Sequence, residues 1–176
     1  MLKSKILKNI GLILIILSIL FIILIKFYFY LDKINHYNVI NNIFINKNST
    51  NDYYLGYIYI KSVNIKRLIV KDINKENLDN KYVAMASSSI SLNSNKNIIL
   101  AGYSIDNVFK NLHKVKINDE IKIITKINEQ IYLVSEILVV NDNDTEYMEQ
   151  TNTNILTLIT CMNNSKKRLI IKALPK

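Results

Sequence analysis

The chain begins with one long apolar segment and continues as a series of short ones. Residues 10–31 contain one charged residue, Lys26, and as an α-helix they extend about 33 Å, enough to cross a bilayer. The segment ends in aromatic residues 27–30, which are common at membrane interfaces, and it offers no small residues for signal-peptide cleavage. Three basic residues precede it: Lys3, Lys5 and Lys8. The pattern predicts an uncleaved signal anchor, with the N-terminus in the cytoplasm and the rest of the chain outside.

A polar, asparagine-rich stretch, residues 32–52, follows the apolar segment. Apolar residues recur in it at roughly helical spacing, which predicts a short amphipathic helix, and residues 46–52 have the composition of a loop. The recurring residues are Ile34, Tyr37, Ile40 and Phe44. We therefore divide the chain into a cytoplasmic N-terminus (1–9), a transmembrane anchor (10–31), a stalk (32–52) and an extracytoplasmic domain (53–176).

From Tyr53 onward the chain alternates between short apolar runs and polar clusters, as expected for strands joined by turns. The runs are rich in Ile, Val, Tyr and Thr. They comprise residues 54–60, 66–70, 81–86, 97–102, 119–126, 130–140, 154–161 and 168–174. Two short helical pieces fit between them, at 75–78 and 107–112. About eight short strands in one domain predict a mainly β fold, a closed or nearly closed β-barrel.

The net charge of the chain limits the classes of molecule that it is expected to bind. The chain carries a formal net charge of +9, from 23 basic and 14 acidic residues. All the acidic residues lie from Asp32 onward, together with 19 of the basic ones, so the exported part carries only +5. Its lysines are dispersed, without aromatic residues between them. The sequence therefore gives no support for binding to nucleic acid.

The only cysteine, Cys161, ends the seventh apolar run, and Arg168 opens the eighth. The thiolate is the reactive form of a cysteine, and a fixed cation near it favours that form. A buried, inert thiol is the alternative interpretation of an unpaired cysteine. Because the chain has one cysteine, an internal disulfide is excluded.

Two histidines and one cysteine are too few for a structural zinc site, and we expect neither a metal nor a cofactor. His36 lies in the predicted stalk, and His113 follows the second predicted helix, where an exposed side chain is the expectation. An acidic loop, residues 142–149, precedes the cysteine-bearing strand. It carries Asp142, Asp144, Glu146 and Glu149. We expect a solvated loop, with a cation-binding loop as the alternative.

The string Thr157-Leu158-Ile159-Thr160-Cys161, with Arg168 seven residues later, is the last of six segments whose order is informative. The other five are 56–58, 61–70, 98–102, 108–112 and 118–123. Together they resemble the sortases, the membrane-anchored cysteine transpeptidases of Gram-positive-type bacteria. The resemblance covers about residues 54–174 and implies an eight-stranded barrel behind one transmembrane helix, in the plasma membrane.

The resemblance also implies a reaction. The Cys161 thiolate attacks the carbonyl that follows threonine in a C-terminal sorting motif of a surface or pilin protein. An amine from a cell-wall precursor or a pilin lysine then resolves the acyl-thioester. Arg168 orients the substrate and stabilises the oxyanion. In the family, a histidine protonates the leaving amine and deprotonates the incoming one.

The histidine position of the family holds Tyr103 here, in Ala101-Gly102-Tyr103. A phenol, with an ordinary pKa of about 10, is a poor general base at neutral pH but can donate a proton. Three functions follow. The first is a transpeptidase or hydrolase with weakened acid–base chemistry. The second is a pseudoenzyme that binds sorting peptides or pilin subunits without cleaving them, and the third is a structural barrel without a peptide groove.

Overall fold

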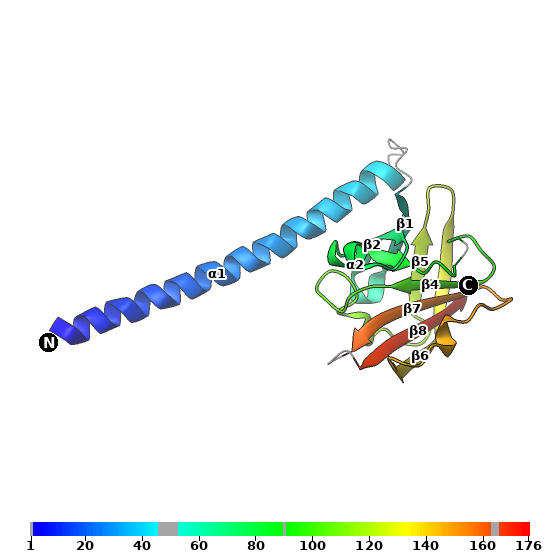
Figure 1. The fold of residues 1–176 in the computed structure, drawn as a ribbon. Helices are drawn as coiled ribbons and strands as arrows, with labels where there is room; N and C mark the ends of the chain where they lie inside the picture. Colours follow the sequence, from blue (N-terminus) through cyan, green and yellow to red (C-terminus); the bar gives the residue numbers. More distant parts are fainter. Residues whose placement is uncertain (1, 46–52, 90, 163–165) are drawn as a thin grey trace. The chain divides into compact units, whose positions relative to one another are not determined.

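The computed structural model describes residues 2–45, 53–89, 91–162 and 166–176 (Figure 1). The chain divides into two compact units, the first ending at Asn35 and the second beginning at His36. The second unit contains all eight strands. The first unit consists of the part of helix α1 that ends at Asn35.

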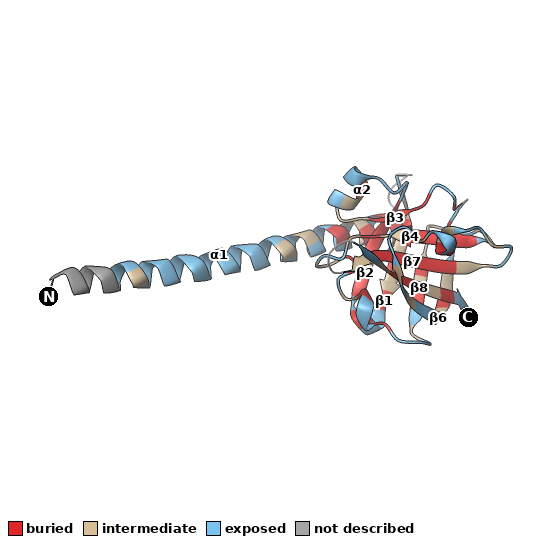
Figure 2. Cartoon of the chain, turned by 60° about the horizontal axis from the view of Figure 1, so that its bottom comes forward, coloured by how far each residue is buried: buried red, intermediate tan, exposed pale blue. Residues whose placement is uncertain are grey.

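Helix α1 runs without interruption from Leu2 to Ile40, and a π-helical turn, Asn41–Ile45, follows it. Most side chains from residue 9 to residue 31 are exposed (Figure 2). The most apolar 18-residue window of this helix has a mean hydropathy of 3.1. By length and composition, α1 is the one helix in the described part of the chain that could cross a membrane, which agrees with a membrane anchor.

Eight strands close into a mixed barrel in the order β1-β2-β3-β4-β7-β8-β6-β5. The pairs β2–β3 and β4–β7 are parallel and the other pairs are antiparallel. The strands are β1 (Tyr54–Ile60), β2 (Ile65–Lys71), β3 (Val83–Met85), β4 (Asn97–Ala101), β5 (Glu120–Ile124), β6 (Glu129–Asn141), β7 (Ile155–Met162) and β8 (Lys167–Pro175). The predicted β-barrel and all eight predicted strands are confirmed.

Alternation along the strands explains the two faces of the barrel wall. In β7, Leu156 and Leu158 point into the large interior cluster, and Ile159 points into a smaller cluster on the outer face. In β2, Ile65 and Ile69 belong to the interior, so Arg67 between them also points inward, and it is only 1% exposed. Buried side chains are concentrated in these strands (Figure 2).

Of the two short helices predicted between the strands, one is present and the other is not. Helix α2 (Lys75–Asp79) confirms the prediction at 75–78, but the prediction of a helix at 107–112 is wrong. That segment forms consecutive turns and a 3-10 turn, Leu112–Lys114. Asn107 has a φ of 66°, in the left-handed region, which interrupts a right-handed helix. The Arg67 guanidinium donates a hydrogen bond to the Asn107 carbonyl. A side chain in the barrel interior therefore stabilises the left-handed conformation of Asn107.

The end of α1 belongs to the same compact unit as the barrel. Ile40, Ile43 and Phe44 are buried and pack with Leu68, which faces outward from β2. The helical spacing of the predicted stalk thus reflects packing onto the barrel wall. The predicted loop at 46–52 lies outside the described residues.

Candidate active site

The thiol and a guanidinium occupy opposite positions on two neighbouring strands. Strand β7 pairs antiparallel with β8, and Cys161 is the register partner of Arg168. Side chains of directly opposed residues lie on the same face of a sheet, with Cβ atoms about 4.5–5.5 Å apart. Cys161 is partly exposed and so is Arg168. The pairing therefore brings a thiol and a guanidinium together on the outer face of the barrel.

Strand β4, which pairs with β7 on the side opposite β8, brings Tyr103 next to Cys161. Strand β4 runs parallel to β7 with Ala101 opposite Ile159, and the Gly102 amide extends the pairing by donating to the Ile159 carbonyl at 3.1 Å. The Thr160 hydroxyl donates to the Gly102 carbonyl at 2.8 Å. Two residues beyond Ala101, Tyr103 lies beside Cys161 and on its face. The three predicted site residues are therefore neighbours, in the order Tyr103, Cys161, Arg168.

The surroundings of Tyr103 keep its hydroxyl protonated. Burial is the largest of the causes that raise the pKa of Tyr103 above its ordinary value. The negative charge of Asp79, a hydrogen bond with the Asp79 carboxylate and the charge of Cys161 raise that pKa further. A phenol with a raised pKa is a proton donor and not a base at neutral pH. The site thus contains an acid at the position where the resemblance expects histidine.

A second tyrosine, Tyr147, borders the site and was not predicted. It lies in the 3-10 turn Glu146–Met148, between β6 and β7, and is 9% exposed. Burial raises the pKa of Tyr147, the positive charge of Arg168 lowers it, and the charges of Asp144 and Cys161 raise it. Its ring packs in the outer apolar cluster with Ile99, Ile159 and Ile170. Tyr147 therefore closes one side of the face that carries Cys161 and Arg168.

Asn97, the first residue of β4, holds this segment against the barrel. Its amide nitrogen donates to the carbonyls of Tyr147 at 3.2 Å and Glu149 at 2.9 Å. Its amide oxygen accepts a hydrogen bond from the Thr157 hydroxyl at 2.7 Å. Asn97 is 3% exposed. Because all three of these bonds join segments distant in sequence, no local pattern predicts them.

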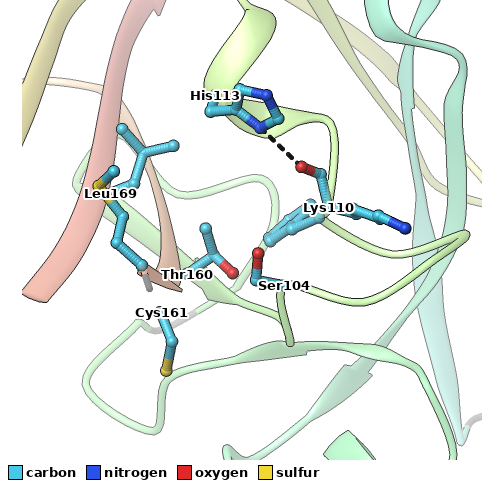
Figure 3. Close-up of a pocket in the computed structure, with 8 residues that line it drawn as sticks. Ser104, Lys110, His113, Thr160, Cys161 and Leu169 are labelled. Carbon is cyan, nitrogen blue, oxygen red and sulfur yellow. Dashed lines mark hydrogen bonds between the residues drawn. The ribbon is translucent and has the colours of Figure 1, made fainter. Parts of the chain in front are cut away.

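A cavity of about 180 Å³ lies beside Cys161 (Figure 3). It is lined by Ser104, Phe109, Lys110, His113, Thr160, Cys161, Met162 and Leu169. Figure 3 shows the Cys161 sulfur pointing away from His113, with Thr160 between them. His113 is exposed, as expected, and its Nδ1 contacts the Lys110 carbonyl at 2.7 Å. His113 is therefore not placed to replace the family's histidine at the thiol.

The acidic segment, residues 142–149, borders a second cavity, and His36 packs against a tyrosine ring. Asp144, Glu146 and Glu149 border a cavity of about 390 Å³ together with Lys172. In the described part of the chain, no group of three His, Cys, Asp or Glu side chains could hold a metal ion. His36, expected in the stalk, is 8% exposed and packs against Tyr82, with ring centroids 5.3 Å apart.

Comparisons with known proteins agree with this geometry. The profile of the family described as Sortase domain matches residues 58–176. A Sortase D5 transpeptidase from Clostridium perfringens is 28% identical, with a TM-score of 0.66, over 75% of this chain and 84% of its own. Sortase A from Listeria monocytogenes is 25% identical, with a TM-score of 0.65, over 71% of this chain and 88% of its own. Sortase C1 from Streptococcus agalactiae, 22% identical over 73% of this chain and 70% of its own, shares the fold with a TM-score of 0.65. No curated protein matches the chain.

Proposed function

The chain belongs to the sortase family, and we propose that it is a membrane-anchored cysteine transpeptidase whose nucleophile is Cys161. One observation carries the proposal. The register of β4, β7 and β8 supports a common site for Tyr103, Cys161 and Arg168, with the thiol in the middle. A nucleophile flanked by a proton donor and a fixed cation is suited to the first half of acyl transfer, the formation of a thioester.

The first half of the proposed reaction uses all three residues. The Cys161 thiolate attacks the carbonyl carbon of the threonine in a sorting peptide, and a carbon–sulfur bond forms. The Arg168 guanidinium stabilises the oxyanion. The carbon–nitrogen bond then breaks, and the leaving amine takes the proton of the Tyr103 hydroxyl. The products are an acyl-thioester on Cys161 and a shortened peptide carrying a free amino group.

The second half lacks a base. An incoming amine, or water, attacks the thioester carbonyl and must lose a proton. The Tyr103 phenolate left by the first half regains a proton from solvent, because burial raises the pKa of Tyr103. The re-formed phenol cannot accept the proton of the incoming amine, so bulk solvent has to do so. General acid–base catalysis typically contributes 10²- to 10⁴-fold in rate, which is about the loss we expect for this step.

The substrate is a sorting peptide of a surface or pilin protein, and the acceptor is an amine from a wall precursor or a pilin lysine. The family supports this choice, and so does the helix that could anchor the chain in a membrane. We place the barrel outside the plasma membrane, with the N-terminus inside, because of the lysines before the apolar segment.

The test uses the full-length chain in detergent micelles with a panel of threonine-containing sorting peptides. Intact-mass spectrometry should detect an acyl adduct on the wild type and none on Cys161→Ala. Arg168→Ala should slow adduct formation by about 10²-fold or more, whereas Lys167→Ala, which removes the neighbouring exposed cation, should not. If neither the wild type nor Tyr103→His forms an adduct with any peptide, the enzymatic proposal fails.

The second candidate function is a pseudo-sortase that binds sorting peptides or pilin subunits without cleavage. The tyrosine in place of the family's histidine is the observation that favours it. It predicts peptide binding that survives Cys161→Ala and weakens in Arg168→Ala. Binding that requires the thiol would contradict it.

A further inference from the structure

The last turns of α1 and the π-helical turn after them carry one buried face. Its residues are His36, Ile40, Ile43 and Phe44, all between 0% and 8% exposed. They recur at the spacing i, i+4, i+7 and i+8, which places them on one side of a helix. Tyr37, Asn38 and Asn42 are exposed. We call residues 36–45 the docked segment, because they belong to the compact unit that contains the barrel.

The docked segment packs on the outer wall of the barrel, over strands β1 and β2. Ile40, Ile43 and Phe44 form an apolar cluster with Leu68 of β2. The Phe44 ring also meets the Tyr57 ring of β1 edge-on, with the ring centroids 5.6 Å apart. These contacts remove apolar surface from water, which favours the docked arrangement over a free one.

Aromatic contacts fix the beginning of the docked segment. The His36 ring lies against the Tyr82 ring, with the centroids 5.3 Å apart. The Lys66 ammonium of β2 lies 4.4 Å from the centroid of the Tyr37 ring and 5.2 Å from that of the Tyr57 ring. A cation over ring faces is attracted by the negative charge of the π-systems. The barrel therefore holds the docked segment from its first residue onward.

Docking shortens the tether between the barrel and the apolar segment of the chain. The apolar segment ends at Leu31, so residues 32–35 alone separate it from the docked segment. Four residues span at most about 14 Å, even when they are fully extended. A free stalk made of all residues 32–52 would span up to about 70 Å. The docked segment thus reduces the reach of the barrel roughly fivefold.

We propose that the docked segment holds the barrel at the surface of the bilayer and thereby directs the acyl-thioester on Cys161 to amines borne by membrane-bound molecules. The proposal rests on the membrane anchor and the cysteine chemistry proposed above. A short tether confines Cys161 to the layer in which such amines are concentrated, whereas a free amine is diluted in the solvent. The partner of the domain is therefore the lipid headgroup layer, and the acceptor is a primary amine displayed there.

The transfer step itself is ordinary aminolysis. The amine nitrogen bonds to the thioester carbonyl carbon, and the carbon–sulfur bond breaks. Cys161 leaves as a thiolate, and the nitrogen loses its proton to solvent. The docked segment takes no part in these bond changes. It acts on the concentration of amine that the thioester meets.

Two insertions of the same flexible Gly/Ser segment, about 12 residues long, test the tether. One lies between Lys33 and Ile34, before the docked segment, and the other between residues 48 and 49, after it. Both full-length proteins are compared with the wild type in vesicles of phosphatidylcholine and phosphatidylglycerol. Förster energy transfer from a dye on Cys161, the only cysteine, to a dye on the lipid headgroups reports the height of the barrel. Thermal unfolding checks that each protein is folded.

The first insertion should lower the energy transfer about twofold, because it adds roughly 19 Å of root-mean-square tether length. The second should leave the transfer unchanged, since the docked segment still fastens the barrel to residue 35. Ile40→Asp should undock the segment by burying a charge, so the second insertion should lower the transfer in that background. Asn38→Asp, on the exposed side of the same helix, is the matched control and should have no such effect.

A second measurement uses the unlabelled proteins and two forms of one acceptor. The acceptor is a lysine peptide, either coupled to a lipid in the vesicles or free in solution. The first insertion lengthens the tether from four residues to about 16, and effective concentration falls roughly as the −3/2 power of length. Resolution of the Cys161 thioester by the lipid-linked peptide should therefore slow about eightfold, with no change for the free peptide. The second insertion should change neither rate.

An equal loss of energy transfer in both insertions overturns the proposal, because the segment is then not docked. No loss in either also overturns it, because another surface then holds the barrel at the bilayer. If the first insertion leaves the preference for the lipid-linked peptide unchanged, the assignment of the acceptor is wrong. If the wild type forms no thioester, the proposed function fails and the assignment of the acceptor fails with it. The energy transfer still decides whether the docked segment holds the barrel, so the two failures are distinguishable.

Discussion

Replacing Asn97 by alanine tests how the segment between β6 and β7 is held over the catalytic face. The buried Asn97 side chain makes three hydrogen bonds, to the carbonyls of Tyr147 and Glu149 and from the hydroxyl of Thr157. Alanine removes all three. The segment then keeps the hydrogen bond from the Gln150 side chain to the backbone carbonyl of residue 97 and the packing of the Tyr147 ring on the outer apolar cluster. We expect the segment to open and the domain to lose stability.

The expected loss of stability follows from the number of hydrogen bonds that the substitution removes. A typical hydrogen bond contributes about 1 kcal/mol net, so three give about 3 kcal/mol. This is a large share of the roughly 5–15 kcal/mol by which a domain is stable. For a domain of this size, about 3 kcal/mol corresponds to a fall in Tm of roughly 10 °C. Thr157→Val removes one of the three bonds and should cost about a third as much.

Thermal unfolding of the full-length variants in micelles measures these shifts. Asn95→Ala is the matched control, since Asn95 is an exposed asparagine two residues before Asn97. Adduct formation on Cys161 supplies a second readout, because Tyr147 borders Arg168. If Asn97→Ala unfolds within about 2 °C of Asn95→Ala, the three hydrogen bonds do not hold this segment and the reasoning is refuted.

Three further predictions concern the site itself. Tyr103→His should raise turnover with an amine acceptor by about 10²- to 10⁴-fold in steady-state kinetics. If turnover does not rise, the absence of a histidine is not what limits the reaction. Resolution of the Cys161 thioester by an amine should accelerate about tenfold per pH unit between pH 7 and 9, because Tyr103 stays protonated and only the free amine reacts. A bell-shaped profile centred near neutral pH contradicts this. Gly102→Ala should lower the free energy of unfolding by about 1–3 kcal/mol, because the added methyl overlaps the Phe109 ring, and an unchanged Tm contradicts it.

The strands could be predicted because their signal is local. Runs such as 54–60 and 97–102 combine β-branched and aromatic residues with polar boundaries, and both occur as strands within one residue of the predicted ends. Cys161 and Arg168 could be paired because consecutive strands of an antiparallel hairpin place their ends together. Tyr103 was found only through the order of the family's motifs.

The rest depends on contacts between distant parts of the chain. The segment 107–112 has helical composition, but Asn107 adopts a left-handed conformation that Arg67, buried in the barrel interior, stabilises through a hydrogen bond. A charged residue in a strand pattern gives no sign that it will face the interior. Tyr147 borders the site through tertiary packing, and it lies in no recognisable motif.

The loss of histidine affects the two halves of the proposed reaction unequally. Forming the thioester requires an oxyanion partner and a proton donor, and Arg168 and Tyr103 are suited to these tasks. Resolving it requires a base, and burial of Tyr103, together with the negative charge of Asp79, raises the pKa of the phenol and disfavours the phenolate that could act as one. An active enzyme of this kind therefore accumulates its acyl-thioester, whereas a pseudo-sortase never forms one. The amount of adduct on Cys161 at steady state thus separates the two functions more directly than turnover does, because slow turnover is common to both.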